Sequence, residues 1–88
     1  MHPPAKPAVV LYGRPGCHLC DEVEAILLAL QPRLNFAISL VNIEADDDLH
    51  RRFMFEIPVV EVHGQVVARA PISRAALESV LQESLQPG

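Results

Sequence analysis

The sequence predicts a single α/β domain in which three helices pack on a four-stranded mixed sheet, in the order β-α-β-α-β-β-α. Early in the chain, a strand-like apolar run, a helical repeat and a second strand-like run follow one another, which implies a right-handed parallel crossover. Later, two short strand-like runs flank His63-Gly64, a pair typical of a two-residue hairpin turn. A chain of 88 residues holds one such domain at most.

The hydrophobic pattern predicts the first strand and the first helix. Residues 8–12 are short, apolar and rich in valine, as expected of a strand that is covered on both faces. Residues 13–16 form the turn after it. From about Cys17 to Gln31, apolar side chains recur at helical spacing and acidic residues follow in the first turn. Pro32 is expected to end this helix because it cannot donate a backbone hydrogen bond.

A second strand and a short helix are expected next. The strand spans residues 36–43, and Asp46 caps a helix that extends through Phe55. The acidic run at positions 46–48 could suggest a site for a hard metal ion, but a capped helix start explains it better. The three phenylalanines are expected to pack in the core or to line the rim of a substrate site: Phe36, Phe53 and Phe55.

The last predicted elements are a hairpin and an amphipathic helix. Residues 59–62 and 65–69 are the two hairpin strands. Ser73 caps the final helix, whose apolar side chains form one stripe. The proline-rich segment 1–7 is expected to be a flexible arm, so that the folded domain covers residues 8–86.

Composition and charge disfavour several classes of function. Half of the residues are apolar, so a core can form without a metal or a stapling disulfide. The formal net charge is −4 and the only adjacent basic pair is Arg51-Arg52, which disfavours nucleic-acid binding. The sequence has neither a signal-peptide pattern nor an apolar run of membrane-spanning length. We therefore expect a soluble, monomeric, cytoplasmic protein without a membrane partner.

The chemistry is expected to come from Cys17-His18-Leu19-Cys20, which contains both cysteines of the chain. The motif follows a strand and opens a helix, where free N–H groups and the helix dipole favour a thiolate. Cys17, at the helix tip, is expected to attack disulfides, and Cys20, deeper in the same turn, to resolve the mixed disulfide. Arg14 or a protonated His18 could stabilise the thiolate further, although His18 could equally be a solvated loop residue.

Three other interpretations of the cysteine pair remain open. A tetrahedral zinc site needs two further ligands, and the other histidines are scattered along the chain. A purely structural disulfide between residues so close in sequence would tie no distant segments together. The two cysteines could also be inert, reduced core residues.

Residues 11–20, Leu-Tyr-Gly-Arg-Pro-Gly-Cys-His-Leu-Cys, resemble a glutaredoxin, and the chain is most similar to a short, largely uncharacterised glutaredoxin-like group. The resemblance extends from Val9 to Leu85. It implies a thioredoxin-like fold and a thiol–disulfide oxidoreductase that works without a cofactor or a metal. The alternative is a thioredoxin-fold binding module without catalytic activity, or a carrier of a metal or an iron–sulfur cluster.

A second match to that family is Glu56-Ile57-Pro58-Val59. The resemblance implies a cis peptide bond between Ile57 and Pro58, placed against the two sulfurs. It also implies that the backbone of Ile57 forms hydrogen bonds with an extended substrate strand. Taken alone, Pro58 could simply begin a strand.

Departures from the glutaredoxin pattern bear on the substrate. Typical glutaredoxins have Cys-Pro-Tyr-Cys, and they bind glutathione through a Gly-Gly turn and an acidic residue after the fourth strand. Here that stretch, residues 69–73, is Arg-Ala-Pro-Ile-Ser, although Arg14 matches a basic position of the glutathione site. The expected partners are therefore a disulfide-containing protein or small thiol and a protein reductant, while glutathione is doubtful.

Overall fold

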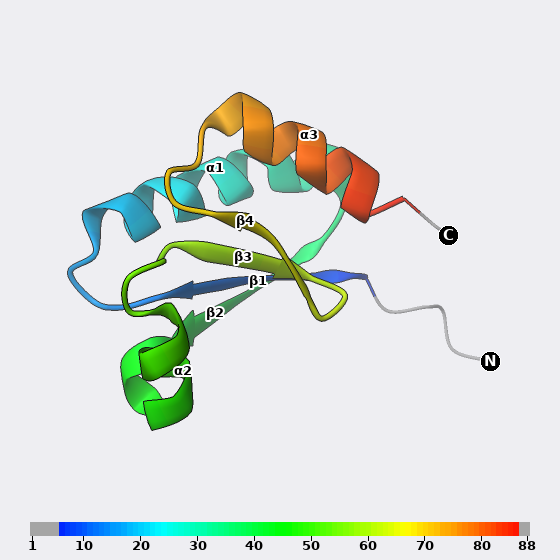
Figure 1. Cartoon of the computed structure of the whole chain (residues 1–88). Coiled ribbons are helices and arrows are strands. Elements are labelled where there is room, and N and C mark those ends of the chain that lie inside the picture. The colour runs from blue at the N-terminus through cyan, green and yellow to red at the C-terminus, as the bar shows by residue number, and fades with distance from the viewer. Residues whose placement is uncertain (1–5, 87–88) are drawn as a thin grey trace.

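A computed structural model of the chain describes residues 6–86 and confirms the predicted order of elements (Figure 1). Residues 1–5 of the expected flexible arm lie outside the described residues, and the first strand begins at Ala8. The elements are β1 (Ala8–Gly13), α1 (His18–Leu34), β2 (Ala37–Asn42), the 3-10 helix η1 (Ile43–Ala45), α2 (Asp47–Phe53), β3 (Val59–Val62), β4 (Gln65–Arg69) and α3 (Arg74–Ser84).

The strands form one mixed sheet in the order β2-β1-β3-β4. β1 pairs parallel with β2 and antiparallel with β3, and β3 pairs antiparallel with β4. The helices α1 and α3 cover one face of the sheet, and α2 lies on the other (Figure 1). The carboxyl end of β1 leads directly into the loop before α1, so the start of α1 lies beside an inner strand of the sheet.

The sheet divides the core into two clusters. The larger cluster fills the α1–α3 face and contains Val9, Leu11, Val23, Leu27, Leu30, Phe36, Val60, Val62, Leu77 and Leu81. The smaller cluster, on the α2 face, contains Ile43, Phe53 and Val59, with Tyr12 packed against it. Successive residues of β1, Leu11 and Tyr12, therefore serve opposite faces, as the period of a strand requires.

Tyr12 links the end of β1 to α2 and β3. Its ring lies 4.9 Å from the ring of Phe53, centroid to centroid, and its hydroxyl donates to Glu61 Oε1 at 3.1 Å. Burial, and after it the nearby Glu61 carboxylate, raises the pKa of the Tyr12 phenol. The hydroxyl therefore stays protonated at neutral pH and keeps its role as a donor.

The prediction that Pro32 ends the first helix is wrong. α1 continues to Leu34, and Asn35 closes it in the left-handed conformation, with its N–H donating to the Gln31 carbonyl at 2.9 Å. A proline within a helix removes the bond from its own nitrogen to the carbonyl four residues earlier, here that of Leu28. Because Leu28 and Pro32 lie on an exposed side of α1, water can satisfy this carbonyl, and the helix persists.

The second strand and the short helix are both shorter than predicted. β2 ends at Asn42, whose side chain accepts from the Glu44 N–H at 2.9 Å and so starts the 3-10 helix. α2 ends at Phe53 rather than Phe55. The Met54 N–H still donates to the His50 carbonyl, but the Glu56 and Ile57 N–H groups both converge on the Phe53 carbonyl in a turn. Phe53 is buried, whereas Phe55 falls in this turn and is 90% exposed.

The predicted caps and the hairpin turn are confirmed. The Asp46 carboxylate accepts from two N–H groups in the first turn of α2. The hydroxyl of Ser73 accepts from the Ala76 N–H at 3.1 Å at the start of α3. His63 and Gly64 both have positive φ, 53° and 78°, as a two-residue hairpin turn of this hand requires.

Within residues 6–86, no helix has the length and apolar character needed to cross a bilayer.

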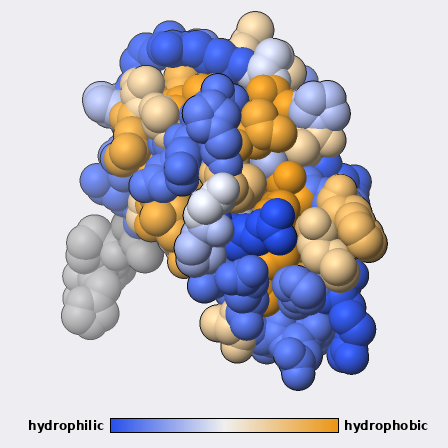
Figure 2. All heavy atoms as spheres, turned by 90° about the vertical axis from the view of Figure 1, so that its left-hand side faces the viewer, coloured by the Kyte–Doolittle hydropathy of each residue, from blue (hydrophilic) through white to orange (hydrophobic). Residues whose placement is uncertain are grey.

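The end of the molecule on the left of Figure 1 is drawn face-on in Figure 2. Its surface is largely hydrophilic, but hydrophobic side chains break through it in several places.

Candidate redox site

Cys17 is the N-cap of α1. Its backbone is extended, with φ −85° and ψ 104°, and its Sγ accepts from the Cys20 N–H at 3.1 Å. Its carbonyl accepts from the Asp21 N–H at 3.1 Å, which begins the helical ladder. A sulfur therefore takes the place that Ser, Thr, Asp or Asn usually fills, at the positive end of a helix of 17 residues. A thiolate at this atom would have both a hydrogen-bond donor and a favourable dipole.

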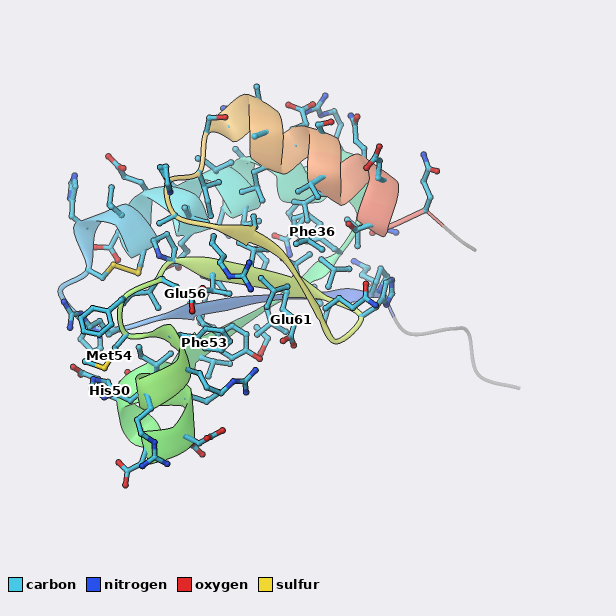
Figure 3. All side chains as sticks on the ribbon, in the orientation of Figure 1. Phe36, His50, Phe53, Met54, Glu56 and Glu61 are labelled. Atoms are coloured by element: carbon cyan, nitrogen blue, oxygen red, sulfur yellow. A yellow bond between two sulfur atoms is a disulfide. The ribbon has the colours of Figure 1, made fainter. Side chains whose placement is uncertain are left out.

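The two sulfurs are joined in a disulfide, drawn as a yellow bond at the start of α1 in Figure 3. The Cα atoms of Cys17 and Cys20 are 5.2 Å apart. Cys20 belongs to the first turn of the helix and is only 5% exposed, whereas Cys17 is half-buried at its tip. Cys17 is therefore the more exposed sulfur of the pair, and Cys20 is the internal one.

Gly13 makes room for Cys20. A Cβ atom at Gly13 would lie 3.0 Å from the sulfur of Cys20 and 3.1 Å from its Cβ. The sequence predicts Gly13 in the turn, but it is the last, buried residue of β1. A glycine that directly follows an apolar strand can signal a close approach of another segment, and this signal was available in the sequence.

The pairing of β1 with β3 brings Pro58 opposite Gly13. Tyr12 pairs with Val59, so the next position along both strands sets Pro58 opposite Gly13. Pro58 is buried, and the peptide bond between Ile57 and Pro58 is cis. The register therefore sets Pro58 opposite the residue whose Cβ position would lie 3.0 Å from the Cys20 sulfur.

The backbone on either side of the peptide bond between Ile57 and Pro58 already forms hydrogen bonds within the chain. The Ile57 N–H donates to the Phe53 carbonyl at 3.0 Å, and the Pro58 carbonyl accepts from the Ala70 N–H at 3.0 Å. Of the backbone groups that the resemblance assigns to substrate binding, the carbonyl of Ile57 is therefore the one that a substrate could use.

Arg14 and His18, the two predicted tuning residues, are both exposed. His18 lies 3.4 Å from Glu22, one helical turn further along, and 86% of its side chain is exposed. A pair this exposed contributes little free energy. Arg14 accepts the Cys17 N–H through its carbonyl at 3.3 Å and lines, together with Cys20, a groove of about 190 Å³. The structure thus brings Arg14 near the site through its backbone, while the His18 ring faces a carboxylate.

Between residues 6 and 86, no three His, Cys, Asp or Glu side chains gather closely enough to hold a metal ion. A zinc ion bound by the cysteine pair would therefore need its remaining ligands from outside this part of the chain.

Comparison with known proteins connects this geometry to a family. A family model described as "Glutaredoxin-like domain (DUF836)" matches residues 8–85. The structure of protein Ne2328 from Nitrosomonas europaea is 26% identical, with a TM-score of 0.73, covering 90% of this chain and 95% of that one. A protein from X. campestris is also 26% identical, with a TM-score of 0.74 and coverage of 85% and 96%.

The likeness in fold extends further than these two proteins. A mutant thioredoxin from Halobacterium salinarum has a TM-score of 0.69 at 13% identity, covering 96% of this chain and 79% of that one. At this level of identity the match concerns the fold, which is that of the thioredoxins.

Gly13→Ala is expected to destabilise the reduced protein by about 1–3 kcal/mol, because the added methyl overpacks the contact with Cys20. Urea unfolding in the presence of a reductant measures this cost. In a Cys20→Ala background the contact with sulfur is gone, so the same substitution should cost less. An equal cost in both backgrounds would show that the sulfur does not limit the space at Gly13.

The Cys17→Ala variant should be less stable to unfolding than the Cys17→Ser variant by ~0.5–2 kcal/mol under reducing conditions, because serine is a good N-cap and alanine is a poor one. Both variants lack the disulfide, so the comparison isolates the cap. Chemical denaturation of the two reduced variants provides the measurement, and equal stabilities would contradict the capping role.

Proposed function

The chain belongs to the glutaredoxin-like family and has the thioredoxin fold, and on this basis we propose that it is a thiol–disulfide oxidoreductase that reduces disulfides. The observation that supports the proposal is the asymmetry of the cysteine pair. A half-buried Cys17 caps the start of α1 and is bonded to a buried Cys20. A dithiol that acts in two steps needs one accessible sulfur and one internal sulfur within reach of it.

In the proposed cycle, the Cys17 thiolate attacks one sulfur of a substrate disulfide. A mixed disulfide forms, the substrate S–S bond breaks, and the leaving thiolate takes up a proton. Cys20, as a thiolate, then attacks the Cys17 sulfur and releases the second substrate thiol. Two electrons have passed to the substrate, and the chain is left with the Cys17–Cys20 disulfide, which a second thiol reductant must reduce.

The site should activate Cys17 moderately. The exposed end of a helix dipole stabilises an anion by about 0.3–1 kcal/mol, and a hydrogen bond to a charged group stabilises it by about 1.5–3 kcal/mol. The Cys20 N–H can provide such a bond to the Cys17 sulfur. Asp21 and Glu22 act in the opposite direction, because both are acidic and exposed near the same helix end.

We propose that a protein dithiol, rather than glutathione, reduces the oxidised form. Glutathione presents two carboxylates and an ammonium, which require charged partners or free N–H groups. At residues 69–71 the charged side chain and the backbone N–H groups are already engaged or missing. Arg69 forms an ion pair with Glu56 at 2.7 Å, the Ala70 N–H donates to the Pro58 carbonyl, and Pro71 has no N–H. A cytoplasmic location would supply such reductants.

Cys20→Ser is expected to accumulate a covalent mixed disulfide, because Cys17 can still attack but nothing releases the partner. Intact mass after incubation with a disulfide substrate, followed by peptide mapping, should locate the adduct on Cys17. Cys17→Ser is the matched control and should hold no such adduct. An adduct-free Cys20→Ser protein would overturn the two-cysteine cycle.

Turnover should be efficient with thioredoxin and its reductase as the electron source and poor with glutathione and its reductase. Each missing charge-assisted hydrogen bond weakens glutathione binding by about 1.5–3 kcal/mol, or roughly ten- to a hundredfold. Two coupled assays of NADPH consumption, run with the same disulfide substrate, make the comparison. Saturable, efficient turnover with glutathione would contradict this assignment of the donor.

A further inference from the structure

β2 is an edge strand whose outer side is open. The sheet order is β2-β1-β3-β4, so β2 pairs with β1 alone, in an unbroken parallel register from Ala37 to Asn42. The strand residues that pack with α2 come from β1, β3 and β4, so this helix does not cover the edge (Figure 1). Within residues 6–86, the backbone of residues 38–41 forms no hydrogen bond outside the ladder with β1. A row of N–H and C=O groups is therefore free to pair with another strand.

The opposite edge of the sheet, β4, carries the features that usually protect an edge strand. Its register with β3 shifts between Val60 and Glu61, and it ends at Arg69, just before the cis peptide bond between Ala70 and Pro71. Bulges, charges and prolines of this kind prevent unwanted strand pairing. β2, Ala-Ile-Ser-Leu-Val-Asn, has no charged residue, no proline and no register shift. This unprotected edge is therefore suited to pairing with a partner strand.

Apolar side chains flank the open edge on the α1 side. Leu40 pairs in register with Leu11, so both point to the α1–α3 face, yet Leu40 is 56% exposed. Ile38 points to the same face and packs against the larger core cluster. On α1, Leu28 is 54% exposed and lies one turn beyond Glu24, which lines a groove together with Leu40. Two of the four large hydrophobic side chains exposed between residues 6 and 86 thus lie on this side of the molecule.

The strand is complementary to itself in the antiparallel direction. A two-fold axis through Ser39, perpendicular to the sheet, sets Ser39 opposite its own copy and Ile38 opposite Leu40 of the second copy. Directly opposite residues of antiparallel strands share a face, so both Ile38–Leu40 pairs join apolar side chains on the α1–α3 face. An axis through Leu40 would instead set Ile38 against the polar Asn42. The axis through Ser39 therefore buries more apolar surface.

Charge favours the antiparallel orientation over the parallel one. Lys6 precedes the residue whose carbonyl accepts from the Ala37 N–H, so it lies near the amino end of β2. At the carboxyl end, the groove beside β2 is lined by two carboxylates and one guanidinium, those of Asp21, Glu24 and Arg14. Antiparallel pairing brings the lysine end of each copy to the acidic end of the other, whereas parallel pairing brings like ends together.

We propose that the protein forms a homodimer in which the two β2 strands pair antiparallel about Ser39 and join the two sheets into one. This assembly replaces the monomer expected from the sequence, and it does not depend on the proposed exchange function. The pairing closes the open edge and leaves the protected β4 strands at both ends of the combined sheet. Because the interface is limited to one strand and its flanking side chains, the dimer should dissociate on dilution.

Cross-linking tests the register directly. Ser39→Cys, in a background of Cys17→Ser and Cys20→Ser, should form a disulfide between copies when diamide oxidises the two thiols. Opposite residues of antiparallel strands have Cα atoms ~4.5–5.5 Å apart, which a disulfide can span. Ala37→Cys is the matched control, because it is also exposed and on the same face of β2. It lies opposite Val41, more than about 10 Å from its own copy, and should not cross-link. Intact mass measures the cross-linked fraction.

Sedimentation equilibrium of the reduced wild-type protein, from micromolar to millimolar concentration, should show a reversible dimer. Leu40→Lys places a charge in the middle of the edge and should raise the midpoint concentration of dimerisation roughly tenfold or more, since each dimer carries the change twice. Leu19→Lys is its matched control and should leave the midpoint unchanged. Leu19 is 53% exposed, against 56% for Leu40, and it lines a groove with Pro58 rather than with β2.

Three results would overturn the homodimer. The first is a wild-type protein that stays monomeric up to millimolar concentration. The second is equal cross-linking of Ser39→Cys and Ala37→Cys, which indicates random collision rather than a fixed register. The third is a Leu40→Lys variant that dimerises as well as the wild type. None of these measurements depends on turnover, so assays of disulfide exchange remain a separate test of the proposed function.

Discussion

The close approach of Gly13 to Cys20 is the constraint on which the site depends. A Cβ atom on Gly13 would lie 3.0 Å from the Cys20 sulfur, closer than an ordinary van der Waals contact, so the absence of a Cβ favours the close packing of the first turn of α1 on the end of β1. This contact buries one sulfur and leaves the other at the helix tip. The distinction between an inner and an outer cysteine, which the proposed chemistry needs, is thus a consequence of how a helix packs on a strand.

The same packing combines structural and chemical roles in one atom. Cys17 is the N-cap of α1, and its sulfur accepts the N–H that a serine or aspartate would otherwise accept. The hydrogen bond that starts the helix is therefore also available to stabilise a thiolate. The free N–H groups of a helix start need an acceptor in any case, so the fold provides this stabilisation without a dedicated side chain.

The surroundings of the disulfide differ on its two sides. Towards β2, Arg14, Asp21 and Glu24 line a groove with mixed charge. Towards the loops of Pro58 and Pro71, the lining is apolar except for Glu22. At the end of β4, Arg69 pairs with Glu56, and the Ala70 N–H donates to the Pro58 carbonyl.

The sequence by itself determined the element order, the caps at Asp46 and Ser73, the turn at His63-Gly64 and the position of the cysteine motif. These features follow from local rules, namely hydrophobic period, side-chain capping and positive φ, which act over a few residues. Element ends were less predictable. α1 continued through Pro32 because solvent could satisfy the freed carbonyl, and solvent exposure is a property of the folded chain.

Only the tertiary structure decided which residues meet at the disulfide. The contact of Gly13 with Cys20, the position of Pro58 opposite Gly13 and the pairing of Arg69 with Glu56 join segments that are distant in sequence. Phe36, Phe53 and Phe55 looked equivalent in the sequence, yet two are buried and the third is exposed. The reason is that strand register and helix packing set the direction of each side chain, and both depend on long-range pairing that no local pattern specifies.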